Sequence, residues 1–174
     1  LREGLILARN ALVGAGLKDE IKLAAAGKVH SGAGIAMNLG LGADWCNAGR
    51  AFMFALGCVQ SMQCHTDRCP TGVATQDPAR QRGLVVEDKW ERVARFQRQT
   101  LATLREMVMA MGYDNPWQIN PAAISQRLDA VRAEPLDRVH RFLHPGELLA
   151  DPDATPYARY WHAAQAGSFI AAAT

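Results

Sequence analysis

The chain has 174 residues, of which 49% are hydrophobic and 21% are charged. This composition can bury a core and excludes a disordered tail or a coiled coil. The net charge of +2 is close to balance. The sequence also lacks the basic stripe, interleaved with aromatic residues, that is typical of nucleic-acid-binding proteins. The sequence contains no run of about 18 apolar residues, so it predicts no membrane span.

The N-terminal segment has no initiator Met. Arg9 and Asn10 interrupt its apolar run, so it does not have the pattern of a signal peptide. We therefore expect the chain to be the C-terminal part of a longer one. Its four cysteines are too few for a disulfide scaffold. Three of them fall between positions 58 and 69, which favours a metal or cluster site in a reducing compartment. A cytoplasmic location is expected.

Helices and strands are predicted to alternate in the first half. In chain order they are a helix over 5–17, a strand over 21–26, a helix over 32–40, a strand over 43–48 and a helix over 51–57. Gly14 and Gly16 end the first helix, and Ser31 is the expected N-cap of the second. A repeat of about twenty residues per strand and helix is typical of parallel βα units.

Two such units cannot close a sheet, because a parallel sheet needs cover on both faces. The predicted fold class is therefore α/β, as the C-terminal part of a (β/α)8 TIM barrel with a mostly helical or irregular C-terminal extension. We expect residues 1–112 to hold the last βα units, the cysteine loop over 58–69 and a long helix. Residues 113–174 are the extension that packs on the barrel.

The second half is predicted to begin with its longest helix, over 87–111, which Gly112 ends. A weaker helix is predicted over 122–132, followed by turns at 144–146 and 151–153. Aromatic residues then predict a tail that docks on the body of the protein. They are Tyr157, Tyr160, Trp161 and Phe169.

The spacing Cys58-x5-Cys64-x4-Cys69-Pro70 places three thiols on one compact loop. Iron–sulfur clusters need soft thiolates that converge from several directions, and three cysteines suit a 3Fe-4S cluster or a 4Fe-4S cluster with an outside ligand. A zinc site with His65 as fourth ligand is the main competitor, and three idle core thiols are the third possibility. The spacing alone does not choose among them. Cys46, on the second strand, is interpreted as a core residue.

Glycines follow both predicted strands. Gly27 and Gly49 allow backbone N–H groups to approach a phosphate, and Lys28 and Arg50 beside them add positive charge. In (β/α)8 enzymes the loops after the last two strands commonly build a phosphate site. Without the barrel, two tight turns are the better explanation of the glycines. Of the histidines, only His30 is kept as a candidate, because it follows the first of these turns.

The run from Gly57 to Pro78, with Cys-His-Thr-x-x-Cys-Pro-x-Gly-Val-Ala-Thr-Gln inside it, resembles the FMN-binding domain of glutamate synthase. Residues 21–32 and 42–50 agree with the same pattern, and the strong likeness covers about residues 5–119. The chain is similar above all to short glutamate synthase-like proteins that lack the amidotransferase.

The resemblance implies a (β/α)8 barrel with FMN and a 3Fe-4S cluster, whose ligands are Cys58, Cys64 and Cys69. It implies that Gly27 and Lys28, with Gly49 and Arg50, surround the FMN phosphate. The implied reaction is reductive amination of 2-oxoglutarate with ammonia or glutamine-derived ammonia. The implied electron source is a donor protein or a nicotinamide-dependent subunit.

Three positions depart from the pattern of the large glutamate synthases. Ala26 stands where Asp is usual, Lys28 where a second Gly is usual, and Arg50 where a small residue is usual. The phosphate site is therefore expected to be more cationic than in the large enzymes. The alternatives that the residues leave open are a zinc- or cluster-stapled binding module and another phosphate-binding barrel enzyme without a redox cluster.

Overall fold

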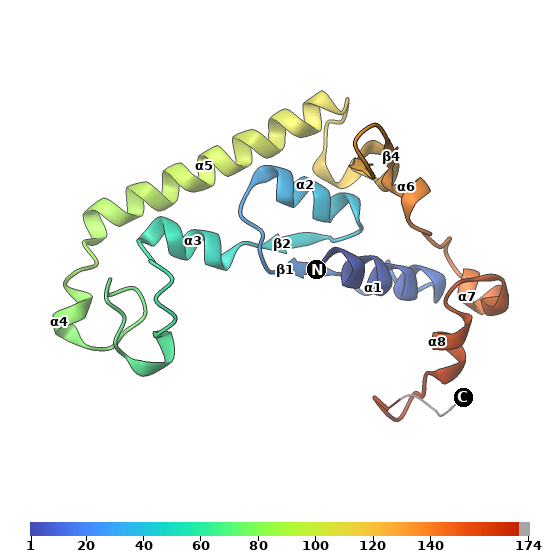
Figure 1. Ribbon diagram of the computed structural model, residues 1–174, viewed down its shortest axis with the longest axis horizontal. Coiled ribbons are helices and arrows are strands. Elements are labelled where there is room, and N and C mark those ends of the chain that lie inside the picture. The colour runs from blue at the N-terminus through green and yellow to red at the C-terminus, as the bar shows by residue number, and fades with distance from the viewer. Residues whose placement is uncertain (171–174) are drawn as a thin grey trace.

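The computed structural model describes residues 1–170 and shows an α/β chain with a long helix along one edge (Figure 1). The helices are α1 (Arg2–Gly14), α2 (Gly32–Gly40), α3 (Gly49–Leu56), α4 (Pro78–Gln81), α5 (Val86–Ala110), α6 (Leu136–Val139), α7 (Glu147–Ala150) and α8 (Ala158–Ala163). The strands are β1 (Ala24–Ala26), β2 (Trp45–Asn47), β3 (Ser125–Arg127) and β4 (Ala133–Pro135).

The predicted βα order is confirmed, although the strands are shorter than expected. β1 and β2 pair in parallel, with Ala24 opposite Trp45 and Ala26 opposite Asn47. Within residues 1–170 they form a sheet of two strands, and these residues close no barrel. Because β1 and β2 are parallel neighbours, their carboxyl ends lie side by side.

Helix α2 is fixed at its start by a side-chain cap. The Ser31 hydroxyl accepts a hydrogen bond from the Gly34 N–H at 3.1 Å, as the sequence predicts. The next residue, Gly32, packs against α5 so closely that a Cβ there would stand 2.5 Å from the Leu104 nitrogen. The missing side chain therefore sets how near the two helices approach.

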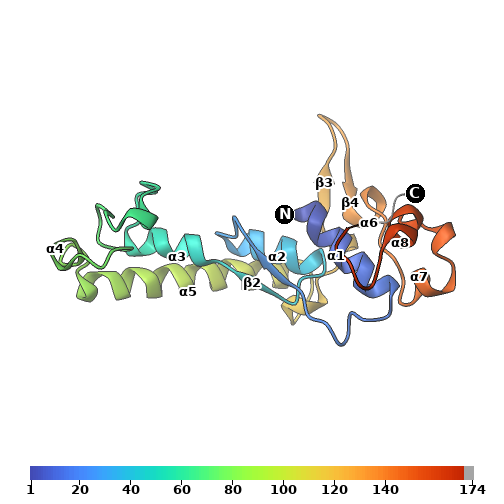
Figure 2. The same cartoon turned by 90° about the horizontal axis from the view of Figure 1, so that it is seen from below.

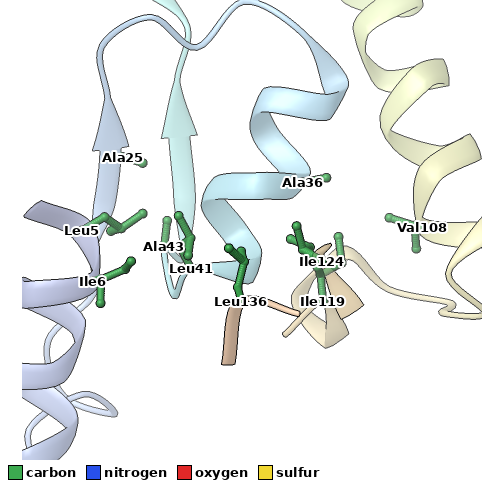
Figure 3. Close-up of a cluster of buried hydrophobic side chains, with 10 residues drawn as sticks. All are labelled: Leu5, Ile6, Ala25, Ala36, Leu41, Ala43, Val108, Ile119, Ile124 and Leu136. Carbon is green, nitrogen blue, oxygen red and sulfur yellow. The ribbon is translucent and has the colours of Figure 1, made fainter. Parts of the chain in front are cut away.

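The buried core lies where α1, α2 and the two parallel strands meet the end of α5 and the segment that follows it (Figure 3). Its members are Leu5, Ile6, Ala25, Ala36, Leu41, Ala43, Val108, Ile119, Ile124 and Leu136. Only the C-terminal part of α5 contributes. Trp90 and Leu101 of the same helix are 60% and 52% exposed. No helix among residues 1–170 is both long and apolar enough to cross a membrane.

The helix predicted over 122–132 is wrong, because this segment forms a hairpin of β3 and β4 that projects from the body (Figure 2). The Asn120 side chain caps a single 3-10 turn over Pro121–Ala123, and the chain then becomes extended at Ile124. The Asp129 carboxylate accepts hydrogen bonds from the N–H groups of Val131 and Arg132. These local side-chain bonds offer the backbone an alternative to a helix.

The aromatic tail docks only in part. The Tyr157 hydroxyl reaches the buried Asn10 of α1, and α7 packs on the same helix. Tyr160 and Phe169, by contrast, are exposed. The attachment of the C-terminal segment therefore depends on polar contacts near Tyr157 more than on the other aromatic rings.

Candidate functional site

A cavity of about 440 Å³ lies at the carboxyl ends of β1 and β2. Its lining includes all four residues predicted to surround a phosphate, Gly27, Lys28, Gly49 and Arg50, together with Ala26, Val29, Asn47 and Ala48. We call it the strand-end cavity. In open α/β sheets and barrels, ligands bind at this edge, outside the carboxyl ends of the strands.

The backbone of this cavity has features that packing within the chain does not require. Gly27 and Lys28 both have positive φ, at 105° and 56°. A left-handed Lys is strained by roughly 1–3 kcal/mol, and such strain clusters at ligand sites. At Gly49 a Cβ would meet no atom within 4 Å, so no protein neighbour demands a glycine there. The bare backbone of Gly49 instead leaves the first turn of α3 open to the cavity.

Two cations face this cavity without a carboxylate partner. Neither Lys28 nor Arg50 makes an ion pair with any residue in the described range 1–170. Arg50 stands in the first turn of α3, which contains no acidic residue. A cation is unfavourable at the positive end of a helix by about 0.3–1 kcal/mol. Together these charges and the start of α3 suit an anion such as a phosphate.

A second cavity, of about 380 Å³, adjoins the cysteine loop. We call it the cysteine cavity. It is lined by Arg50, Met53, Phe54, Cys58, Gln60, Met62 and Cys64. Two of the three predicted thiols therefore share one largely apolar hollow.

The third thiol, Cys69, does not line the cysteine cavity. It is buried, with 5% of its surface exposed. Its sulfur lies 3.5 Å from the Thr71 hydroxyl oxygen. Hydrogen bonds from this hydroxyl and from the N–H groups of Ala74, Thr71 and Val73 lower the pKa of Cys69 to about 7. These donors favour the thiolate, which is the form that binds metals.

The segment over 72–76 folds back on the cysteine loop and holds it through hydrogen bonds. The Asp67 carboxylate accepts hydrogen bonds from the Thr75 hydroxyl and the Gln76 N–H, and the Asp67 carbonyl accepts another from Thr75. Gly72, with φ of 75°, passes directly beneath the Arg80 carbonyl, where a Cβ would clash. The loop is thus held against α4 by contacts that involve no thiol.

Soft thiol ligands suit an iron–sulfur cluster and also suit zinc. Within residues 1–170 no three His, Cys, Asp or Glu groups are placed to hold one metal ion, as a zinc site with His65 would require. In a three-iron cluster each thiolate binds its own iron, so the sulfur atoms surround a core without meeting at a point. Soft thiols, among them Cys69 with its lowered pKa, are suitable ligands for the irons of such a cluster.

Other sequence interpretations have mixed outcomes. Cys46 is half-buried against the core, and burial raises the pKa of its thiol, so it behaves as a packing residue. His30 is exposed and lines neither the strand-end cavity nor the cysteine cavity. Sequence reasoning missed Thr71 and Asp67. A hydroxyl two residues after a cysteine is a weak signal for the first, and the partners of Asp67 lie too far along the chain to be anticipated.

The arrangement is that of an α/β chain with a cation-lined cavity at the ends of two parallel strands, beside a cysteine loop. The conserved region of glutamate synthase matches residues 1–114, and the chain belongs to this family. This match includes the strand-end cavity, the cysteine loop and α5.

Individual relatives agree with this assignment. The chain is 35% identical over 129 residues to the glutamate synthase large subunit-like protein YerD of Bacillus subtilis, covering 74% of this chain and 25% of the relative. It is 32% identical over 110 residues to the large chain of glutamate synthase (NADPH) of the same species, covering 63% and 7%. It is 34% identical over 100 residues to the archaeal glutamate synthase (NADPH) of Methanocaldococcus jannaschii, covering 58% and 20%. The chain therefore spans a quarter or less of the length of these relatives.

Proposed function

We propose that this chain supplies the phosphate-binding edge and the cluster loop of an FMN- and iron–sulfur-dependent oxidoreductase of glutamate synthase type. The proposed reaction is the reductive amination of 2-oxoglutarate to glutamate with ammonia or glutamine-derived ammonia. Electrons come from a donor protein or a nicotinamide-dependent subunit. In this proposal β1 and β2 are the last strands of a (β/α)8 barrel.

The observation that carries the proposal is that the two cavities share a wall. Arg50 lines both the strand-end cavity and the cysteine cavity. A flavin phosphate at the first and a cluster at the second would therefore be neighbours. This proximity is what electron transfer between two cofactors needs, and no other described residue lines both spaces.

The residues of the chain have separate tasks in this proposal. Gly27 and Gly49 let the backbone approach the phosphate, while Lys28 and Arg50 neutralise its charge. Cys58, Cys64 and Cys69 hold the cluster as thiolates. When bound, FMN supplies hydride chemistry and the cluster supplies one-electron chemistry.

The test is cofactor analysis of the purified protein that contains this chain, by visible absorbance and by iron and acid-labile sulfide content. We expect flavin and about three irons per chain, in line with a 3Fe-4S cluster. Cys64→Ser should lose iron and sulfide, whereas Cys46→Ser, a change at a packing thiol, should retain both. Zinc without iron, or full iron content in Cys64→Ser, would overturn the assignment.

A further inference from the structure

We infer that Arg50 has a second role besides phosphate binding: its charge raises the reduction potential of the cluster held by the cysteine loop. The inference rests on the proposed function and goes beyond it, because it makes one side chain an electrostatic link between two cofactors. Arg50 is in this sense a positioning and tuning residue, since it transfers no electron itself.

The first support is position. Arg50 lines the cysteine cavity together with Cys58 and Cys64, and it also lines the strand-end cavity. Lys28, the other cation of the strand-end cavity, does not line the cysteine cavity. The chain therefore provides two cations with the same access to a phosphate and different access to the cluster.

The second support is charge. No carboxylate within residues 1–170 pairs with Arg50, so no neighbour in this range cancels its field. Reduction adds one electron from the donor to the cluster, and the donor is oxidised by one electron, with no bond made or broken. The reduced cluster is more negative by one unit, so a cation beside it stabilises the reduced form. Met53 and Phe54 share the cavity with Arg50, which is itself exposed, so water and salt screen part of its charge.

The third support is the absence of a structural reason for the charge at this position. Arg50 is the second residue of α3, whose positive end repels its charge, and no described hydrogen bond uses its guanidinium. A residue that served α3 alone would more favourably be acidic or neutral. The cost is offset if anionic groups occupy the spaces on both sides of it.

The experiment compares Arg50→Gln with Lys28→Gln in the protein as purified with its cofactors. Two quantities are measured: the FMN dissociation constant after flavin removal, and the midpoint potential of the cluster by potentiometry monitored by electron paramagnetic resonance. Both variants should weaken FMN binding by about tenfold or more, because each removes a charge-assisted contact. Only Arg50→Gln should shift the cluster potential to more negative values, and Arg50→Lys should restore most of the shift.

The outcomes separate this inference from the proposed function. If the parent protein holds neither flavin nor iron, the proposed function fails. If it holds both and the two Gln variants have the same cluster potential as the parent, only the inference on Arg50 is overturned. If Arg50→Gln does not keep its cluster, Arg50→Met, which retains the apolar length of the side chain, replaces it in the same comparison. An equal shift in Lys28→Gln would also overturn the inference, because it would show a general effect of lost charge or lost flavin.

Discussion

The Asn10 amide donates a hydrogen bond to the Tyr157 hydroxyl at 2.7 Å, although 147 residues separate them. Asn10 is completely buried in α1, and its side chain also donates to the Arg141 carbonyl and accepts from the Leu143 N–H. The buried Asn10 amide therefore gives hydrogen-bond partners to two backbone groups of the C-terminal segment, the Arg141 carbonyl and the Leu143 N–H. This contact attaches the C-terminal segment to the βα units.

Replacing Asn10 with Ala should destabilise the fold by about 3 kcal/mol, since it leaves buried backbone groups without partners. Tyr157→Phe removes only one of the bonds and should cost about 1 kcal/mol. Urea denaturation measures both. Tyr160→Phe is the matched control, because Tyr160 is 61% exposed, and a loss equal to that of Tyr157→Phe would refute the role of the buried bond.

Gly32→Ala should destabilise the protein by about 1–3 kcal/mol, because the new Cβ would press on the Leu104 nitrogen and the Thr100 carbonyl of α5. Gly34→Ala, two residues further along α2, is the control. Its Cβ would lie 3.5 Å from the Ser31 hydroxyl oxygen, an ordinary contact, and alanine is the better helix former by about 1 kcal/mol. Thermal unfolding should therefore move in opposite directions for the two variants, and equal shifts would contradict the close approach of α2 and α5.

The ion pair of Lys18 and Asp44 should make stability depend on acid. Partial burial raises the pKa of Asp44, but hydrogen bonds from Lys18 and from the Leu23 N–H outweigh it and hold the pKa below its ordinary value. A lowered pKa means that the stabilisation is full above about pH 4, the ordinary value for Asp, and is lost as pH falls through the lowered value.

Asp44→Asn should therefore reduce stability by about 1 kcal/mol at pH 7 and by much less at pH 2–3. Denaturation curves across this pH range give the free energy of unfolding of the parent and of the variant. The difference between the two is free of the contribution of other carboxylates, because both proteins share them. A difference that stayed constant with pH would show that the charge of Asp44 is not the source of the stabilisation.

Phe52 and Phe96 join α3 to α5 through an edge-to-face contact, with ring centres 5.2 Å apart. Phe96→Ala should cost about 2 kcal/mol and should loosen α3, which carries Arg50. Hydrogen exchange along α3 detects the loosening directly. Trp90→Ala serves as control, because its larger ring is 60% exposed on the same helix. Faster exchange in the Trp90 variant than in the Phe96 variant would argue against the contact as the anchor of α3.

Local signals in the sequence were sufficient to predict the elements around the strand-end cavity. Ser31 caps α2 as expected, and Gly27 takes a positive φ at the end of β1. Both features depend on neighbours within a few residues, so the chain itself specifies them. The gathering of Lys28 and Arg50 in one cavity follows in turn from the parallel pairing of β1 and β2.

Features that depend on distant partners were not predictable. The Ala-rich start at Ala122 favours a helix, yet packing of Ile124 into the core and the turn at Asp129 produce a hairpin. Leu101 has the right spacing for an apolar stripe but is exposed, because α5 meets the described core only near Val108. Periodicity shows which face of a helix is apolar and does not show what covers it.

The 25-residue length of α5 has a mechanical consequence. At about 1.5 Å per residue it is a rod of roughly 37 Å, with the α3–α4 region at one end and the buried cluster around Val108 at the other. α2 packs on this helix at Leu104 and α3 packs on it through Phe96, so α5 spans the distance between the buried cluster and the cysteine loop.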